Sequence, residues 1–400
     1  MKLIAGEEIV FKHLEPSVDL KMSDEEINQK YVKGEVRIIT EQARYPLPSI
    51  VVMLSGTDYK LNPEFQRRHR WNITQKSKLI ESFIMNVPIP PIFLYEDSYS
   101  HYEVMDGLQR LTAIKEFYKD EFVLDGLEEW PELNGKKYSS LPIQIKKGID
   151  RRYLSSIILL QETAKNELDA MQLKQLVFER INSGGVKLEP QESRNAVFNG
   201  PLNELCIKLA RNKFLCKTWQ IPEQTEDEIS NNNPSDELIQ NDLFRDMGDV
   251  ELVLRFFANR QREGLIKYTR SLKDYLNNYL KYGNSLPSET LIEMGKLFNE
   301  TIEFLYELLG EQAFCLYRNR NGKWNWYSRP TTAVYDPLTV IASEFLGAKG
   351  KILEKKNGIV TLLESFYSKY YDDFEGRNTN QGIISKREER IRELFQELSK

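Results

Sequence analysis

Apolar residues follow two different patterns along this chain. In the first half they form short runs between polar turns, at 31–52, 92–95 and 102–105, and such runs predict β-strands. After about residue 168 they recur every three or four positions, as at 291–309, and this spacing predicts helices. The sequence therefore predicts an α+β fold, with a mixed front half followed by a mainly α-helical back half.

Two helices in the front half have well-marked starts. Asn72 is a capping residue with Gln75 three positions later, and the prolines of 86–91 end this helix. Asp106 and Gln109 repeat the arrangement for a second helix. We expect both helices to bury an apolar face, formed by Leu79, Ile80, Phe83 and Ile84 in the first and by Leu111, Ile114 and Phe117 in the second.

An acidic stretch interrupts the helical pattern of the back half. Nine acidic residues and a single basic residue, Arg245, lie between positions 223 and 249, with Asn-Asn-Asn-Pro at 231–234. Such a segment is typical of a solvated loop or hinge, and it indicates a boundary nearby.

Composition narrows the chemistry. The net charge of −5 gives the 400-residue chain no overall attraction to nucleic acid or anionic lipid, so a DNA contact needs a local basic patch. Three cysteines without a CxxC pair and no evident leader or spanning segment predict a cytoplasmic protein without membrane contact. No histidine follows His101, which excludes a Cys/His zinc site, an HExxH protease and a histidine-based nuclease from the last three hundred residues.

Three stretches carry candidate chemistry. Residues 62–71 place Arg67, Arg68 and Arg70 directly before a helix N-terminus, where free amides favour an anion. On spacing alone, an exposed basic loop that pairs with nearby acids explains the same residues. Both interpretations stay open.

The second stretch, 102–110, runs from a strand through Asp106 and Gly107 into a helix. Gly107 lets the backbone approach a ligand closely, Arg110 can bind a phosphate, and Asp106 can hold a cation. An ordinary capped helix, with its arginine paired to an exposed carboxylate, is the alternative.

The third stretch, 178–192, contains the loop Asn182-Ser183-Gly184-Gly185 between two predicted helices. Glycine-rich amides can form an anion-binding nest, and Glu179 and Asn182 would lie at its mouth. A plain helix–loop–helix corner is the alternative.

Taken together, the three stretches resemble a known family, the N-terminal domain of GmrSD-type modification-dependent restriction enzymes, in the ParB/sulfiredoxin-like superfamily. The resemblance covers about 31–205, in order and with the spacing of the family. One departure is Leu108, where the family commonly has glutamine. The matching residues are Asn62-Pro63, Phe65-Gln66-Arg67, Trp71, Leu79-Ile80-Glu81-Ser82, Pro88-Ile89-Pro90, Asp106-Gly107-Leu108-Gln109-Arg110-Leu111-Thr112-Ala113 and Phe178 through Ala196.

The resemblance implies a ParB/sulfiredoxin-like nucleotide-binding domain at 31–205. The sequence pattern adds an N-terminal extension (1–30) before it and a mainly helical C-terminal domain (206–400) after it. The resemblance further implies Mg²⁺-dependent hydrolysis of a nucleoside triphosphate in a DNA restriction or phage-defence system. In that interpretation, the chain is a switch or sensor for a separate nuclease or other effector, and Glu179, Asn182, Leu188, Pro190 and Glu192 correspond to a ParB stretch that contacts triphosphate and metal.

The implied roles fall on three sets of residues. The catalytic set is Asp106, Gln109 and Arg110, with Gln109 positioning water. The metal set is Asp106 and Asn182. The nucleotide-binding set is Gln66, Arg67, Arg70, Gly107, Arg110, Glu179, Asn182, Gly184 and Gly185.

Other functions stay open at this point. The chain can be a non-catalytic adaptor that binds DNA or nucleotide, or a ParB-like nuclease. Family members usually carry an HNH nuclease domain, which needs histidine, so the absence of histidine after His101 predicts a stand-alone member. The sequence leaves the nucleotide, the occurrence of hydrolysis, the effector and the oligomeric state undetermined.

A second candidate interface lies in the back half. Residues 316–329 contain no acid and mix cations with aromatics, the pattern of a DNA contact. Asn321-Gly322 equally predicts a β-hairpin with aromatics packed across its strands, and both interpretations can hold together. The DNA-binding candidates are Arg318, Arg320, Lys323, Trp324 and Trp326.

Overall fold

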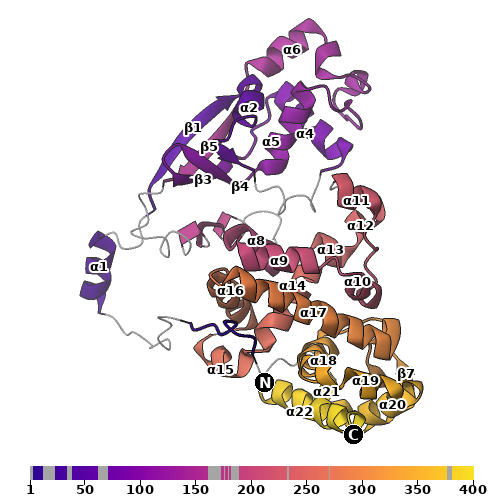
Figure 1. Cartoon of the computed structure of the whole chain (residues 1–400). Coiled ribbons are helices and arrows are strands. Elements are labelled where there is room, and N and C mark those ends of the chain that lie inside the picture. The colour runs from indigo at the N-terminus through magenta and orange to yellow at the C-terminus, as the bar shows by residue number, and fades with distance from the viewer. Residues whose placement is uncertain are drawn as a thin grey trace. The chain divides into compact units, whose positions relative to one another are not determined.

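The computed structural model forms two compact units (Figure 1). We call residues 19–188 the sheet unit, and residues 1–18 with 189–400 the helical unit. These two units are defined by contacts within the structure. The domain limits predicted from the sequence, at residues 30 and 205, stay predictions. The residues that the structure describes are 3–11, 23–33, 38–61, 71–160, 173–174, 176–178, 180–181, 189–231, 234–269, 271–375 and 381–400.

A five-stranded mixed sheet is the centre of the sheet unit. Its spatial order is β1-β5-β3-β4-β2. β1 and β5 are antiparallel, β5 and β3 parallel, β3 and β4 antiparallel, and β4 and β2 parallel. The strands are β1 (Thr40–Pro46), β2 (Tyr59–Lys60), β3 (Ile92–Ser98), β4 (His101–Asp106) and β5 (Tyr153–Leu159).

Helices cover one face of this sheet (Figure 1). Alternate strand residues such as Leu94, Val104 and Ile158 join one apolar core with Ile80 and Ile114 from two of the helices. The helices of the unit whose bounds the structure gives are α1 (Asp24–Lys33), α2 (Leu47–Met53), α4 (Ile73–Met85), α5 (Leu108–Tyr118) and α6 (Ile143–Asp150), with 3₁₀ turns at Pro131–Leu133 and Tyr138–Ser140.

The capped helix predicted after Asn72 is confirmed. The Asn72 side chain accepts the Gln75 amide, and Gln75 in turn accepts the Asn72 amide, which satisfies two of the donors that every helix start leaves unpaired. Three of the four predicted core residues of α4 are buried and Ile84 is partly buried. The strands predicted at 92–95 and 102–105 are likewise confirmed as β3 and β4.

Three predictions about local structure are wrong. The segment 47–53 is a helix, not a strand, because Pro48 occupies the first turn of α2, where proline is well accommodated. The apolar run 153–159, which is not among the strands predicted above, is strand β5. The acidic stretch 223–249 is a series of short capped helices rather than a loop; Ser235 and Asn241, for example, each accept a first-turn amide.

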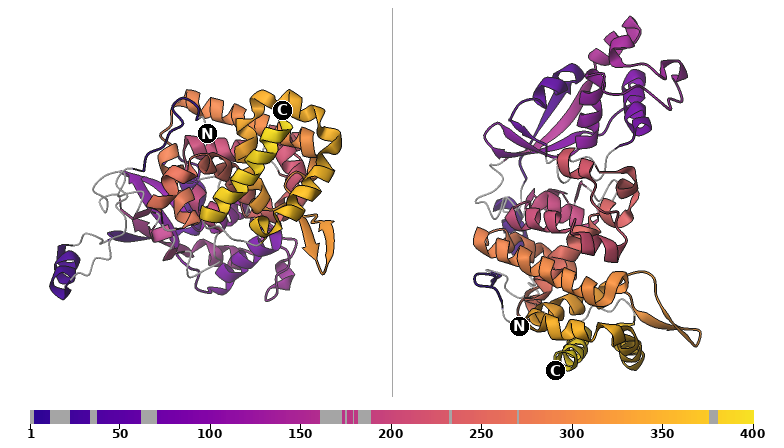
Figure 2. Two further views of the ribbon diagram at one scale, coloured as in Figure 1. Left: turned by 90° about the horizontal axis from the view of Figure 1, so that it is seen from below. Right: turned by 45° about the vertical axis from the view of Figure 1, so that its right-hand side comes forward.

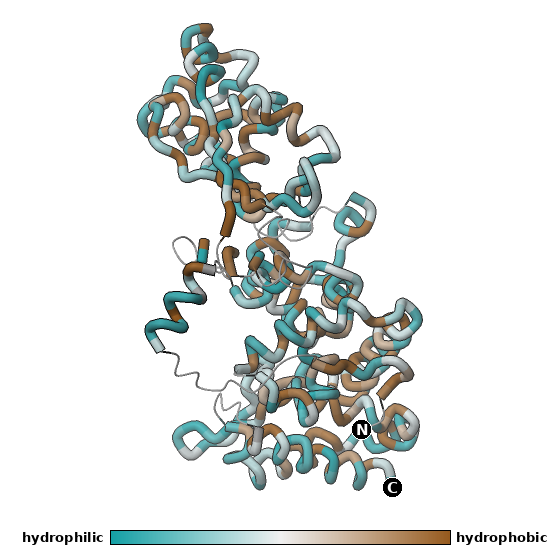
Figure 3. The backbone as a smooth tube through the Cα atoms, turned by 90° about the vertical axis from the view of Figure 1, so that its left-hand side faces the viewer, coloured by the Kyte–Doolittle hydropathy of each residue, from teal (hydrophilic) through white to brown (hydrophobic). Residues whose placement is uncertain are grey.

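The helical back half is confirmed. Helices α14, α17 and α18 pack on one another, α9 packs on α14 and α17, and α22 packs on α18. Hydrophobic and hydrophilic stretches alternate along their turns (Figure 3), as expected for helices that bury one face. The helices are α8 (Pro190–Val197), α9 (Pro201–Leu209), α10 (Lys213–Trp219), α11 (Glu226–Asn231), α12 (Asp236–Gln240), α13 (Asp242–Arg245), α14 (Gly248–Asn259), α15 (Arg262–Leu265), α16 (Leu272–Gly283), α17 (Ser288–Leu309), α18 (Thr332–Glu344), α19 (Lys349–Glu354), α20 (Ile359–Lys369), α21 (Tyr371–Phe374) and α22 (Gln381–Leu398).

The predicted hairpin is also present. Strands β6 (Tyr317–Arg320) and β7 (Lys323–Trp326) pair antiparallel and project from the helical unit (Figure 2). Asn321 and Gly322 both have positive φ, 54° and 79°, which fits the tight turn that an Asn-Gly pair favours.

None of the helices that the structure describes is both long enough and apolar enough to cross a membrane.

Candidate functional site

The site begins at Gly107, between β4 and α5. Its φ of 95° lies in the left-handed region, and a Cβ built there would be 2.3 Å from Ile92 Cγ2. Only glycine fits this conformation and this contact. The predicted capping role of Asp106 is wrong, because Asp106 ends β4 and Gly107 takes the capping position. The first turn of α5 thus has no side-chain cap for its backbone amides.

Arg110 ties this turn to the proline-rich segment that follows α4. Its Nη2 pairs with Asp106 Oδ2 at 2.5 Å, and its Nη1 donates to the carbonyl oxygens of Pro90 and Pro91. The Asp106 side chain is 37% exposed and that of Arg110 is 12% exposed. The turn therefore offers a solvent-accessible carboxylate while most of the guanidinium is held inside it.

Gln109 connects the same turn to the start of α4. Its Oε1 accepts the backbone N–H of Trp71 at 3.1 Å, and Trp71 packs against the core of the sheet unit. Residue 71 directly follows the arginine-rich stretch 62–70. One helical turn, residues 108–110, is thus bonded to two other segments that carry the family resemblance.

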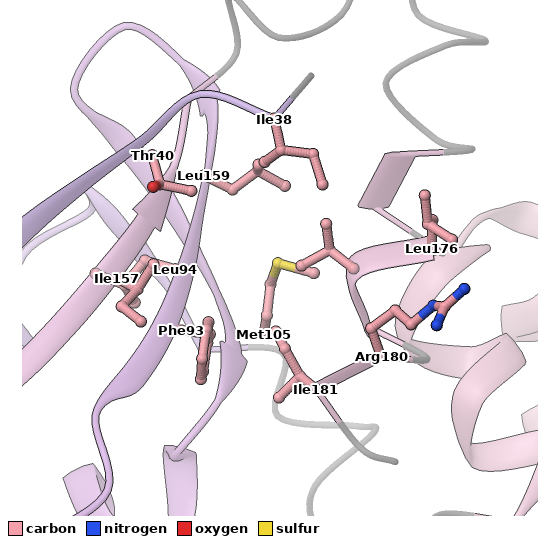
Figure 4. Close-up of a pocket in the computed structure, with 11 residues that line it drawn as sticks. Ile38, Thr40, Phe93, Leu94, Met105, Ile157, Leu159, Leu176, Arg180 and Ile181 are labelled. Carbon is pink, nitrogen blue, oxygen red and sulfur yellow. The ribbon is translucent and has the colours of Figure 1, made fainter. Parts of the chain in front are cut away.

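The second face of the sheet borders an apolar cavity of about 400 Å³ (Figure 4). Phe93 and Ile157 line it and alternate along their strands with the core residues Leu94 and Ile158, so they lie on the face away from α4 and α5. Met105, the residue before Asp106, also lines the cavity.

A helical segment forms the other wall of the cavity. Leu176, Arg180 and Ile181 line it opposite the strands (Figure 4). Lys174 anchors the segment through an ion pair with Glu103 of β4 at 2.5 Å, with both side chains largely buried. The lining is apolar apart from Thr40 and Arg180, so this cavity suits a hydrophobic group and not a phosphate.

Lys174 also lies 5.7 Å from the ring centroid of Tyr95. Burial raises the pKa of the Tyr95 phenol above its ordinary value, and the carboxylates of Asp97 and Glu103 raise it further. Tyr95 is therefore protonated at neutral pH and does not serve as a base there.

Several predicted site residues lie outside the described residues. The structure brings together Asp106, Gly107, Gln109 and Arg110 and says nothing of the remaining nucleotide-binding candidates. No cluster of three His, Cys, Asp or Glu side chains suited to a metal occurs within the described part of the chain. The candidates outside it are Gln66, Arg67, Arg70, Glu179, Asn182, Gly184 and Gly185.

The end of the third stretch belongs to the helical unit. Glu192 is 4% exposed, and its carboxylate accepts the Glu189 amide at the start of α8. Arg194 is 2% exposed and donates to Glu251 at 2.7 Å and to Asn277 at 2.9 Å. In the structure these two side chains stabilise α8 within its own unit.

On the hairpin, aromatic and cationic side chains lie on opposite faces. Tyr317 stacks on Trp324, and Trp326 donates its indole N–H to Glu364 of α20 at 3.0 Å. This agrees with the predicted cross-strand packing, and both tryptophans are engaged within the chain. Arg318 and Arg320 pair across the strands with Asn325 and Lys323, on the other face, where Arg320 and Lys323 are exposed.

Sequence reasoning missed the groups that hold the site together. The carbonyls of Pro90 and Pro91 bind Arg110, and the Glu103–Lys174 pair holds the cavity wall. The sequence did carry a signal for the proline carbonyls, because a Pro-Pro pair keeps its carbonyl acceptors while lacking N–H donors. Nothing in the sequence pattern predicted the ion pair between Glu103 and Lys174.

A comparison of the sequence with known protein families gives a match to one family model. Residues 50–199 match the family model described as the GmrSD restriction endonuclease, N-terminal domain. No curated protein and no solved structure matches the chain. The family resemblance is therefore confirmed for residues 50–199, while the ParB/sulfiredoxin-like superfamily stays a prediction.

We predict that Gly107→Ala destabilises the sheet unit. The positive φ costs about 1–3 kcal/mol for a residue with a Cβ, and the contact with Ile92 adds to it. The free energy of unfolding, measured by urea denaturation, should fall accordingly. Gly148→Ala is the matched control: no heavy atom lies within 4 Å of a Cβ there, and removing a glycine from the interior of α6 should stabilise by about 0.5–1 kcal/mol. Equal stability of the Gly107→Ala variant and the unsubstituted chain would contradict the steric account.

Proposed function

We propose, from the premise that residues 50–199 are a GmrSD-type N-terminal domain, that this chain is a nucleotide-binding module of a DNA restriction or phage-defence system. The module binds a nucleoside triphosphate, hydrolyses it with Mg²⁺, and acts as a switch or sensor for a separate effector.

The observation that carries the proposal is the turn from Asp106 to Arg110. A glycine without a side chain leads into a helix of eleven residues whose first turn is uncapped, so backbone amides and the helix dipole favour a phosphate group there. Arg110 lies in that turn, paired with Asp106, and its guanidinium is the proposed phosphate contact when Asp106 holds the cation. Phosphoryl transfer needs mainly positioning and charge neutralisation, and this turn supplies both.

The donor set fits a magnesium ion better than a zinc ion. Mg²⁺ is commonly bound through one or two carboxylates together with phosphate oxygens and water, so a three-residue protein cluster is not required. Asp106 offers an accessible carboxylate, and Asn182 is the second proposed oxygen ligand. When bound, the cation would neutralise phosphate charge.

Gln109 and Arg110 have different roles in this proposal. Gln109 is a positioning residue, because its Oε1 holds the Trp71 amide and with it the end of the stretch that contains Arg67 and Arg70. Arg110 contacts the phosphate and, through the Pro90 and Pro91 carbonyls, keeps the turn in place.

We predict that Asp106→Asn and Arg110→Ala reduce triphosphate turnover about a hundredfold or more, since each removes a group that stabilises charge in the transition state. Purified protein should be assayed with each of the four NTPs, with and without Mg²⁺ and DNA. Asp97→Asn and Arg151→Ala are matched controls, because Asp97 of β3 pairs with Lys60 of β2 and Arg151 is exposed at the end of α6.

Each outcome discriminates between functions. Turnover that depends on Mg²⁺ and falls in both variants supports the proposal. Tight nucleotide or DNA binding without turnover would indicate a non-catalytic adaptor, and nicking of plasmid by the purified chain would indicate a ParB-like nuclease. Turnover that is unchanged in both variants would overturn the site.

A second candidate function, DNA binding, rests on the hairpin. We propose that the face with Arg318, Arg320 and Lys323 binds the phosphate backbone, because it is opposite the face that packs on α20. Arg320 and Lys323 are exposed there, and Arg318 is partly exposed and lies 4.6 Å from the Tyr327 ring centroid. Trp324 and Trp326 then support the hairpin and do not stack on bases in this state. The proposed contact is electrostatic and independent of sequence.

We predict that replacing Arg318, Arg320 and Lys323 together by glutamine weakens DNA binding and lowers its salt dependence. Three lost phosphate contacts reduce the slope of log affinity against log salt by roughly 2–3. Glutamine at Lys351, Lys355 and Lys356, all exposed in the same unit, removes the same charge elsewhere and should leave the slope nearly unchanged. If both triple variants lower the slope equally, the hairpin is not the contact.

A further inference from the structure

A second cavity, of about 280 Å³, lies within the helical unit. Pro190 and Gln191 of α8, Trp219 of α10 and Glu251 of α14 line it, and Asp246 contributes from the end of α13. Apart from Pro190, which lies in the stretch compared above with ParB, none of these residues has a role in the proposed nucleotide site. The cavity combines apolar walls with a few polar groups, which is the usual make-up of a small-molecule site.

The orientation of the Gln191 amide is fixed by its neighbour. Arg194 donates from Nη1 to Gln191 Oε1 at 2.9 Å, and because arginine only donates hydrogen bonds, the oxygen must face Arg194. The amide nitrogen, Nε2, therefore faces the other way. Gln191 is 2% exposed, and this nitrogen has no hydrogen-bond partner among the described residues.

A second buried donor lines the same cavity. The indole nitrogen of Trp219 is buried and also lacks a partner in the described part of the chain. The ring packs against Phe314 and Tyr335, with centroid distances of 6.1 and 5.6 Å, so turning the N–H to another acceptor would disturb these contacts. Leaving a buried donor unsatisfied costs about 1–3 kcal/mol, so two of them in one cavity point to a ligand with two acceptors.

The charges around the cavity indicate what such a ligand is. Glu189, Asp246 and Glu251 line it, and Glu251 is held by Arg194 at 2.7 Å and by Arg255 at 3.4 Å. Asp246 is paired with Arg245 at 3.1 Å, and Arg255 is also paired with Asp336. Because these charges are compensated within the chain, an uncharged ligand is favoured. A group that donates hydrogen bonds is favoured beside the carboxylates. The ligand is thus uncharged, with acceptors on one side and donors on another.

We propose that this cavity binds a nucleoside through its base. A nucleobase has apolar faces that suit Pro190, Leu243 and Leu252, carbonyl or ring-nitrogen acceptors for Gln191 and Trp219, and N–H donors for Glu251 or Asp246. The carboxylates select against a phosphorylated form of the same compound. The cavity belongs to the helical unit and the Asp106–Arg110 turn to the sheet unit, and this proposal does not depend on triphosphate hydrolysis.

The indole N–H of Trp219 gives a direct test. The full chain, labelled with ¹⁵N, should be titrated with adenosine, guanosine, cytidine and uridine, and separately with their 5′-monophosphates. The chain has five tryptophans, and the Trp219→Phe variant identifies the Trp219 indole resonance by its disappearance. We expect at least one nucleoside to shift that resonance, with its monophosphate binding more weakly.

Two variants then measure the donors separately by calorimetry. Trp219→Phe keeps an aromatic ring and removes the N–H, and Gln191→Glu keeps an acceptor for Arg194 and removes the amide donor. Each should weaken nucleoside binding about tenfold or more, the expected effect of losing a buried hydrogen bond. Trp130→Phe, at an exposed position of the sheet unit, is the control and should bind like the unsubstituted chain.

The proposal is overturned if none of the four nucleosides shifts the Trp219 resonance, because a base bound in the cavity would accept a hydrogen bond from this N–H. It is equally overturned if a nucleoside binds but Trp219→Phe and Gln191→Glu bind it as well as the control. Neither result bears on triphosphate turnover, so the two proposals fail independently.

Discussion

The close approach of Gly107 to Ile92 is the constraint on which the front half of this protein depends. Because no Cβ fits there, β4 ends and α5 begins within a single residue. Asp106 and Arg110 are then one helical turn apart, and Nη2 of Arg110 pairs with Asp106. The other terminal nitrogen, Nη1, donates to the Pro90 and Pro91 carbonyls. A loop of ordinary length would separate these groups. The proposed phosphate site is thus a consequence of a packing requirement in the sheet unit.

The family resemblance extends across the division between the two units. Asp106 and Arg110 lie in the sheet unit, whereas Arg194, from the last matching stretch, is buried in the helical unit beside Glu251. A buried arginine needs a paired carboxylate, and Glu251 meets this requirement from α14, far along the sequence. The arginine pair lowers the pKa of the Glu251 carboxyl although its burial opposes this. The end of the third matching stretch therefore stabilises the helical unit. The earlier part of the same family match supplies the proposed ligand-binding residues of the sheet unit.

The sequence predicted those elements that local chemistry determines. The capping box of Asn72 and Gln75, the hairpin turn at Asn321-Gly322 and the helical spacing of the back half all follow from interactions within a few residues. It could not predict that 153–159 is a strand, because the partners of β5 on β1 and β3 lie more than fifty residues away. The same holds for the site. Asp106 and Gly107 were found from their motif, but the bond from Gln109 to Trp71 and the unpartnered donors of Gln191 and Trp219 depend on tertiary packing.

Hydrogen–deuterium exchange of the β4–α5 turn, measured in Mg²⁺ with and without nucleoside triphosphate, tests the central claim most directly. A phosphate held by the first turn of α5 should slow exchange of the amides at 107–111, relative to Mg²⁺ alone, while the amides of α6 keep their rates. Slower exchange confined to that turn is the result that the account predicts. Triphosphate binding that leaves exchange at 107–111 unchanged would contradict it.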